Sequence, residues 1–147
     1  MNHAELESLV FRALDKLNYC DFELFDLDAS EWAIAHRLAV YLEHELPAHW
    51  NVDCEYNRQG SEREAKAMGS GGKIRPDIVI HHRTLPEPEH NLLVIELKKK
   101  GADADLMKAC NYTKQPKGYR KFQYQYGLAL SVIDRPKLHW FMEGKPL

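Results

Sequence analysis

The chain has 147 residues, with 22 acidic and 20 basic side chains and a formal net charge of −2. This length fits a single domain, residues 1–147, with a sizeable core. No apolar run approaches the roughly 20 residues that span a membrane, the N-terminus lacks the pattern of a secretory signal, and the three cysteines are too far apart for a structural zinc site. We therefore expect a cytoplasmic protein in a reducing compartment.

The charges are distributed unevenly along the chain. Residues 1–50 carry ten acidic and three basic side chains, whereas residues 51–147 carry twelve acidic and seventeen basic ones. The chain as a whole is therefore not expected to bind nucleic acid nonspecifically, although its second part can face a polyanion.

Hydrophobic periodicity predicts three helices. Apolar residues spaced three and four apart indicate helices over residues 4–17 and 31–46, the second capped by Ser30 and ended by Pro47. Glu31 lies one turn before the apolar stripe of the second helix, so its carboxylate faces either the core side or, as helix N-termini allow, the water. A third helix is expected from Asp103 or Asp105 to about residue 113. In it Leu106, Met107 and Cys110 would face inward, and Lys108 would lie elsewhere on the surface.

Strands are expected where apolar residues alternate or form short runs bounded by turn formers. The ranges are 51–58, 78–80, 92–95, 122–132 and 138–142. Residues 59–73 are rich in glycine, serine and charge, which favours a mobile loop with a short helical turn over 61–68. The order of these elements predicts an α/β fold in which helices flank a mixed sheet.

Three charged residues fall at the ends of two expected strands. The strands over 78–80 and 92–95 read as an antiparallel hairpin that turns near Pro86. Asp77 and Glu96 are equally far from that turn, so they are expected to be neighbours. Glu96 and Lys98 share one face of their strand because side chains alternate. Two carboxylates and one ammonium are therefore predicted to meet at the end of a buried sheet.

This set of side chains suits phosphodiester hydrolysis. Neighbouring carboxylates repel each other unless a proton or a cation lies between them, and Mg²⁺ typically takes one or two protein carboxylates while keeping its waters. The Leu97 carbonyl is a candidate third ligand. Lys98 can hold or deprotonate an activated water, or neutralise charge on a phosphate. Taken singly, each charged residue is more typical of a strand end that reaches solvent than of a catalytic site, and only the set of three points to catalysis.

Pro76-Asp77, followed one strand later by Glu96-Leu97-Lys98, resembles the signature of the PD-(D/E)xK nuclease superfamily. The resemblance implies a restriction-endonuclease-like αβββαβ core, here with an extra N-terminal helix and C-terminal strand. It implies that Asp77 and Glu96 bind Mg²⁺ or Mn²⁺ and that Lys98 assists the attacking water. Many members add a glutamate from the first core helix, which Glu31 matches, with Glu55 as the competing residue. DNA is the implied substrate rather than RNA, and a homodimer is compatible with this size.

Basic residues near the predicted site are candidates for contacts to phosphates. They are Arg58, Lys66, Lys73, Arg75 and Lys99. Lys66 and Lys73 are favoured because a mobile insertion beside the site could close over a nucleic acid.

Two classes of function remain open. The leading hypothesis is a metal-dependent endo- or exonuclease. The alternative is a catalytically silent binding module, or a helper subunit, that keeps the same fold. An intact set of Asp77, Glu96 and Lys98 favours the enzyme.

Overall fold

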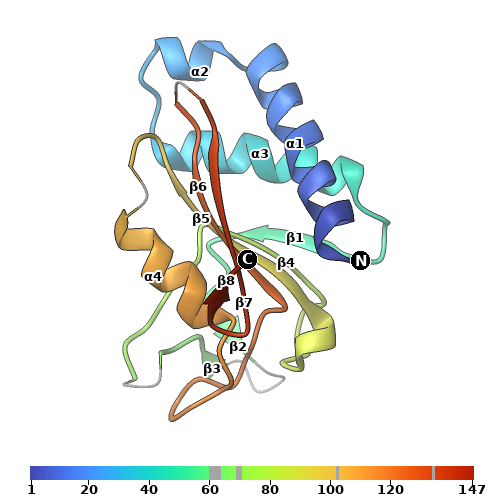
Figure 1. Cartoon of the computed structure of the whole chain (residues 1–147), viewed down its shortest axis with the longest axis vertical. Helices are drawn as coiled ribbons and strands as arrows, with labels where there is room; N and C mark the ends of the chain where they lie inside the picture. Colours follow the sequence, from blue (N-terminus) through green and yellow to red (C-terminus); the bar gives the residue numbers. More distant parts are fainter. Residues whose placement is uncertain (60–63, 69–70, 102, 134) are drawn as a thin grey trace.

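The structure is a computed structural model that describes residues 1–59, 64–68, 71–101, 103–133 and 135–147 (Figure 1). It confirms the mixed α/β class, with a six-stranded, mostly antiparallel sheet between helices. None of the helices in these described parts is long and apolar enough to cross a membrane.

Two long helices pack together on one face of the sheet. Helix α1 (His3–Cys20) starts with a capping box between Asn2 and Glu5, and α3 (Glu31–Glu45) is capped by the Ser30 side chain, which accepts a hydrogen bond of 3.2 Å from the Ala33 N–H. The short helix α2 (Glu23–Asp26) joins them. The apolar stripes of both long helices are buried in one cluster with the sheet, so the two helices predicted from periodicity are confirmed.

The sheet has the order β1-β4-β5-β6-β7-β8. Its strands are β1 (Asn51–Cys54), β4 (Ile78–His81), β5 (Asn91–Lys98), β6 (Tyr126–Ser131), β7 (Lys137–Met142) and β8 (Lys145–Pro146). Only the β5–β6 pair is parallel among these strands, because α4 (Asp103–Tyr112) carries the chain across the sheet between them. A 3-10 turn, η1 (Pro88–His90), precedes β5, and β2 (Arg58–Gln59) pairs with β3 (Glu64–Ala65) as a separate ribbon.

Helix α4 covers the face opposite α1 and α3 (Figure 1). Side chains of β5 alternate between the two layers: Leu93 and Ile95 belong to the cluster with α1 and α3, whereas Val94 packs with Tyr112 of α4. Glu96 and Lys98 follow Val94 at intervals of two, so they point to the α4 side of the sheet.

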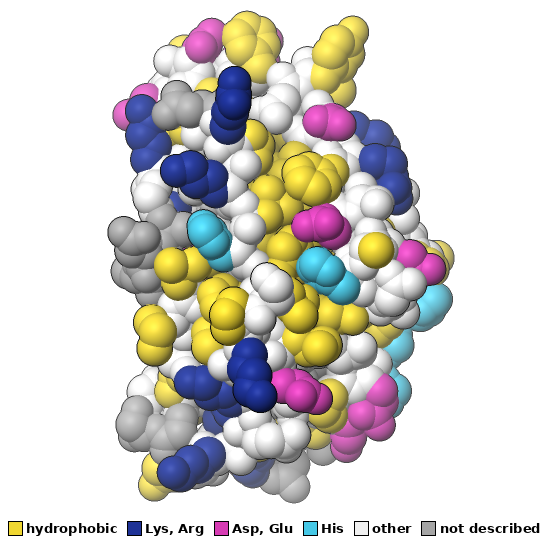
Figure 2. Space-filling view, in the orientation of Figure 1, with side chains coloured by type: hydrophobic (Ala, Val, Ile, Leu, Met, Phe, Trp, Pro, Cys, Tyr) yellow, Lys and Arg dark blue, Asp and Glu magenta, His cyan; other side chains and the backbone are white. Residues whose placement is uncertain are grey.

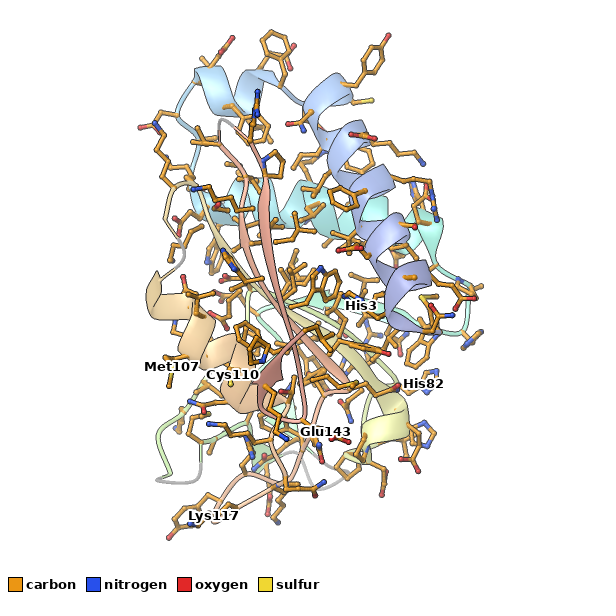
Figure 3. The ribbon with its side chains drawn as sticks, in the orientation of Figure 1. His3, His82, Met107, Cys110, Lys117 and Glu143 are labelled. Atoms are coloured by element: carbon orange, nitrogen blue, oxygen red, sulfur yellow. The ribbon has the colours of Figure 1, made fainter. Side chains whose placement is uncertain are left out.

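Several expectations about the loops and the third helix are corrected. The strand predicted over 51–58 ends at Cys54, since Glu55 has a positive φ of 51°. Residues 64–65 pair as strand β3 instead of joining a helical turn over 61–68, whose first residues lie outside the described part. Met107 of α4 is 61% exposed and points away from the sheet (Figure 3).

The strand predicted over 122–132 begins only at Tyr126. Phe122 and Tyr124 are buried against Tyr112 at the end of α4, and the Tyr124 N–H donates to the Tyr112 carbonyl at 3.0 Å. The alternation of apolar residues therefore reflects packing beside a helix end rather than pairing in the sheet.

Gly127 allows α4 to lie close to β6. A Cβ atom at this position would overlap the Ala109 carbonyl oxygen. We predict that Gly127→Ala lowers the free energy of unfolding by about 2 kcal/mol, because the helix must move off the sheet. Urea denaturation measures this, with Gly72→Ala as the matched control, since nothing lies within 4 Å of the place that its added methyl group would take. Equal stability of the two variants would contradict the close packing.

Candidate functional site

The antiparallel register of β4 and β5 places Asp77 opposite Glu96. Ile78 pairs with Ile95 in this register, so Asp77, directly before β4, faces Glu96, the next residue on β5. The Asp77 carboxylate accepts a hydrogen bond of 2.7 Å from the Leu97 N–H. The neighbour relationship that the spacing from the turn predicted is therefore confirmed.

Glu31 reaches the same strand end from the start of α3. Its Oε2 lies 2.8 Å from Lys98 Nζ, and its Oε1 accepts a hydrogen bond of 3.1 Å from the Lys99 N–H. Glu55 instead lies 3.7 Å from Arg75, and its N–H donates to the Asp77 carbonyl. Of the two competing glutamates, Glu31 is the one bonded to Lys98.

Helix α4 adds three residues to the site that the sequence did not single out. Lys108 Nζ lies 2.8 Å from Asp105 Oδ1 and 3.2 Å from Glu96 Oε2, and the Tyr112 hydroxyl donates to Glu96 Oε1 at 3.1 Å. Lys108 lies on the surface as predicted, with 53% of its side chain exposed, but its ammonium reaches Asp105 and Glu96, which the sequence did not indicate. The available signal was the spacing of 105, 108 and 112 along one face of a helix that follows β5 directly.

Asp105 connects the two lysines. Its side chain is 2% exposed, and its Oδ2 lies 3.7 Å from Lys98 Nζ without a hydrogen bond to any described residue. The network thus runs from Glu31 through Lys98, Asp105 and Lys108 to Glu96, with acidic and basic groups alternating.

Burial shifts the pKa values of Asp77 and Glu96, the central carboxylates of the site. Burial, together with the neighbouring Asp77 carboxylate, raises the pKa of Glu96 to about 7. Burial also raises the pKa of Asp77, against the hydrogen bond from Leu97. Both groups therefore bind a proton more readily than exposed carboxyls, which is the expected behaviour of like charges confined in one site.

In the outer ion pair, Glu31 and Lys98, the pKa shifts favour the charged forms instead. Burial acts to raise the pKa of Glu31, but the hydrogen bonds from Lys98 and Lys99 outweigh it, and the pKa lies below its usual value. The hydrogen bond to Glu31 raises the pKa of Lys98. Lys98 is therefore held in its charged form.

The oxygen atoms of Asp77 and Glu96 are the candidate ligands of a metal ion. Among the residues that the structure describes, no group of three or more His, Cys, Asp or Glu side chains is arranged to hold an ion. The candidate ligands remain the carboxylates of Asp77 and Glu96 and the carbonyl of Leu97. Hard oxygen donors of this kind suit Mg²⁺ or Mn²⁺, which complete their coordination with water.

The five basic residues expected to contact phosphates lie in different surroundings. Arg58, Lys73 and Arg75 are exposed, and Lys99 is bonded to the Asp28 carboxylate at 2.5 Å. Figure 2 shows that Lys and Arg side chains on the displayed face lie scattered among apolar and acidic ones. A nucleic acid on this face would therefore contact individual basic side chains and not one continuous basic patch.

Lys66 is buried instead of lying on a mobile surface loop. Its ammonium donates to the Tyr124 hydroxyl at 2.7 Å and lies 4.9–5.1 Å from the ring centres of Tyr56, Phe122 and Tyr124. Only 2% of the residue is exposed. Its ammonium is therefore enclosed by aromatic rings and does not present its charge to a ligand.

Comparisons of this chain with protein families, with curated proteins and with solved structures found no match.

The buried position of Lys66 predicts a pH dependence of stability. Burial lowers its pKa to about 7, from a usual value of 10.5. Between these values the unfolded chain binds more protons than the folded one, so this lysine makes stability rise with pH above about 7. Lys66→Met is expected to raise the free energy of unfolding at pH 7 by about 2 kcal/mol and to flatten the rise in stability between about pH 7 and pH 10.5.

Urea titrations at several pH values measure this effect, and Lys73→Met, on an exposed neighbour, serves as the control. An unchanged pH profile in Lys66→Met would contradict the buried ammonium.

Proposed function

We propose that this protein is a metal-dependent nuclease of the PD-(D/E)xK type that hydrolyses phosphodiester bonds, in DNA rather than RNA. The observation that carries the proposal is the meeting of Asp77 and Glu96 at one strand end, with Lys98 two residues further along the same face. The chain order α3, β1, β4, β5, α4, β6 supports a restriction-endonuclease-like core. The preference for DNA follows from the resemblance alone.

The donor set fits a divalent cation. Glu96 is buried and Asp77 beside it is half-buried, so their charges repel, and burial together with this repulsion raises the pKa of Glu96. A bound Mg²⁺ or Mn²⁺ supplies a water of lowered pKa and neutralises phosphate charge. Asp77, Glu96 and the Leu97 carbonyl would hold the ion.

The role of Lys98 follows from its bond to Glu31. Because this contact raises the pKa of Lys98, the side chain stays an ammonium and does not act as a base. We therefore assign to it the positioning of the attacking water and the stabilisation of negative charge on the phosphate. Glu31 positions Lys98 rather than binding the substrate.

The ammonium of Lys108 already provides a positive charge beside Glu96. Its contact at 3.2 Å partly neutralises this carboxylate, so a cation would compete with Lys108 for Glu96. The same observation favours a second candidate function, a binding module or helper subunit in which Lys108 and Tyr112 satisfy Glu96 permanently.

The nuclease proposal predicts cleavage that depends on both metal and site. Purified protein with Mg²⁺ or Mn²⁺ is incubated with single-stranded, double-stranded and branched DNA and RNA. Asp77→Ala is expected to abolish cleavage and Lys98→Ala to slow it about 100-fold, since a charge-stabilising donor is lost. Lys145→Ala, on the exposed strand β8, is the control. Cleavage that persists in both site variants would sink the assignment.

Competition between Lys108 and a cation allows the proposed metal site to be tested by a binding measurement that does not depend on catalysis. Lys108→Met is expected to destabilise the protein without metal by about 1 kcal/mol, because Glu96 loses a partner. It should also tighten Mn²⁺ binding in isothermal titration calorimetry, since the competing ammonium is gone. Glu96→Gln should abolish the binding. Absence of Mn²⁺ binding in both the parent protein and Lys108→Met would favour the binding module.

A further inference from the structure

A hollow lies directly beside the candidate catalytic carboxylate. It has a volume of about 290 Å³ and a mostly apolar surface. Its lining residues are Trp32, Ala35, His36, Cys54, Glu55 and Asp77. Asp77 belongs both to this hollow and to the proposed metal site, so a molecule held here is next to the reacting phosphate.

Two aromatic rings line the hollow from the first turns of α3. Trp32 follows Glu31 directly and is 64% exposed, although it is the largest type of apolar side chain. His36 lies four residues later and therefore on the same side of the helix. Flat rings beside an open apolar space are suited to stacking against another planar ring.

Two charged groups complement a nucleotide: Glu55, which lines the hollow, and Arg75, which contacts Glu55. Arg75, two residues before Asp77, has a side chain that is 64% exposed, and its guanidinium lies 3.7 Å from the Glu55 carboxylate. The guanidinium can bind a neighbouring phosphate, and Glu55 can accept a hydrogen bond from the amino group of a base. Single-stranded nucleic acid is commonly bound by aromatic rings that stack on its bases together with cations that contact its phosphate backbone.

We propose that this hollow binds one unpaired nucleobase, that of the nucleotide adjoining the cleaved phosphodiester. The inference rests on the proposed nuclease function and specifies its substrate as nucleic acid that is single-stranded, or unpaired, at the cut. A base in an intact duplex is stacked and paired and must leave the helix to enter such a space. Fully paired DNA is therefore a poor substrate.

The test compares Trp32→Ala and Trp32→Phe with the parent protein. Fluorescence anisotropy with Asp77→Asn as the background measures binding of a single-stranded oligodeoxynucleotide without cleavage, and a metal-dependent assay in the Asp77 background measures the cleavage rate. We expect Trp32→Ala to weaken binding and slow cleavage about tenfold, as loss of one stacked base does. Trp32→Phe keeps a ring and should retain most of both. Tyr19→Ala, which removes an aromatic side chain that is 89% exposed on α1, is the control.

An abasic site, placed at each position of the oligonucleotide in turn, locates the bound base. At one position next to the cut it should weaken binding to the parent protein about tenfold and cause no further loss in Trp32→Ala, because ring and base form one interaction. Equal losses in both proteins at every position would overturn the inference, as would a preference for intact duplex.

The outcomes separate the two proposals. Cleavage that requires Asp77 but not Trp32 upholds the nuclease and overturns the base site. Absence of cleavage of every substrate, with single-stranded binding that still requires Trp32, overturns the nuclease and upholds the base site. Binding that is identical in Trp32→Ala and the parent overturns the base site in either case.

Discussion

The repulsion between a buried carboxylate, Glu96, and its half-buried neighbour, Asp77, is the constraint to which the surrounding structure responds. The register of β4 and β5 sets Asp77 opposite Glu96, where burial raises the pKa of both. Such a pair requires a proton or a cation nearby. Lys108 from α4 contacts Glu96, and Lys98 from β5 is held charged by Glu31 from α3. Ion pairs among these residues thus connect the start of α3, the end of β5 and the middle of α4.

The parts of this site that depend on local sequence could be predicted. Counting residues from the turn was enough to pair Asp77 with Glu96, because an antiparallel hairpin leaves little freedom of register. The apolar stripe of α3 left Glu31 between the inward side and the water, and its bond to Lys98 decides for the inward side. The helix-capping role of Ser30 also follows from residue type and position. In the other two cases the periodicity of one element or one hairpin carries the information.

Other features depend on tertiary packing that a single element does not encode. The rotation of α4 decides that Lys108 faces Glu96 and that Met107 faces water, and this rotation is fixed by contacts to β6 at Gly127. Lys66 lies in a segment whose composition indicates a loop, yet three aromatic rings surround its ammonium, and two of them, Phe122 and Tyr124, come from a distant part of the chain. The late start of β6 has the same origin, since burial next to a helix end and pairing in a sheet give the same alternation.

The energetic cost of the charge network bears on whether it is functional. Glu31 and Lys98 have side chains about one-third exposed, and pairs of this kind contribute little to stability because solvent screens them. Glu96 and Asp105 are almost fully buried, where well-packed apolar residues would often be as stabilising or more so. A scaffold that only binds a partner gains no stability from placing four carboxylates and two ammoniums at one strand end. A site that held a cation and placed a charge on a phosphate, as we propose, would require them, and the open hollow beside Asp77 would bind a nucleotide next to that phosphate.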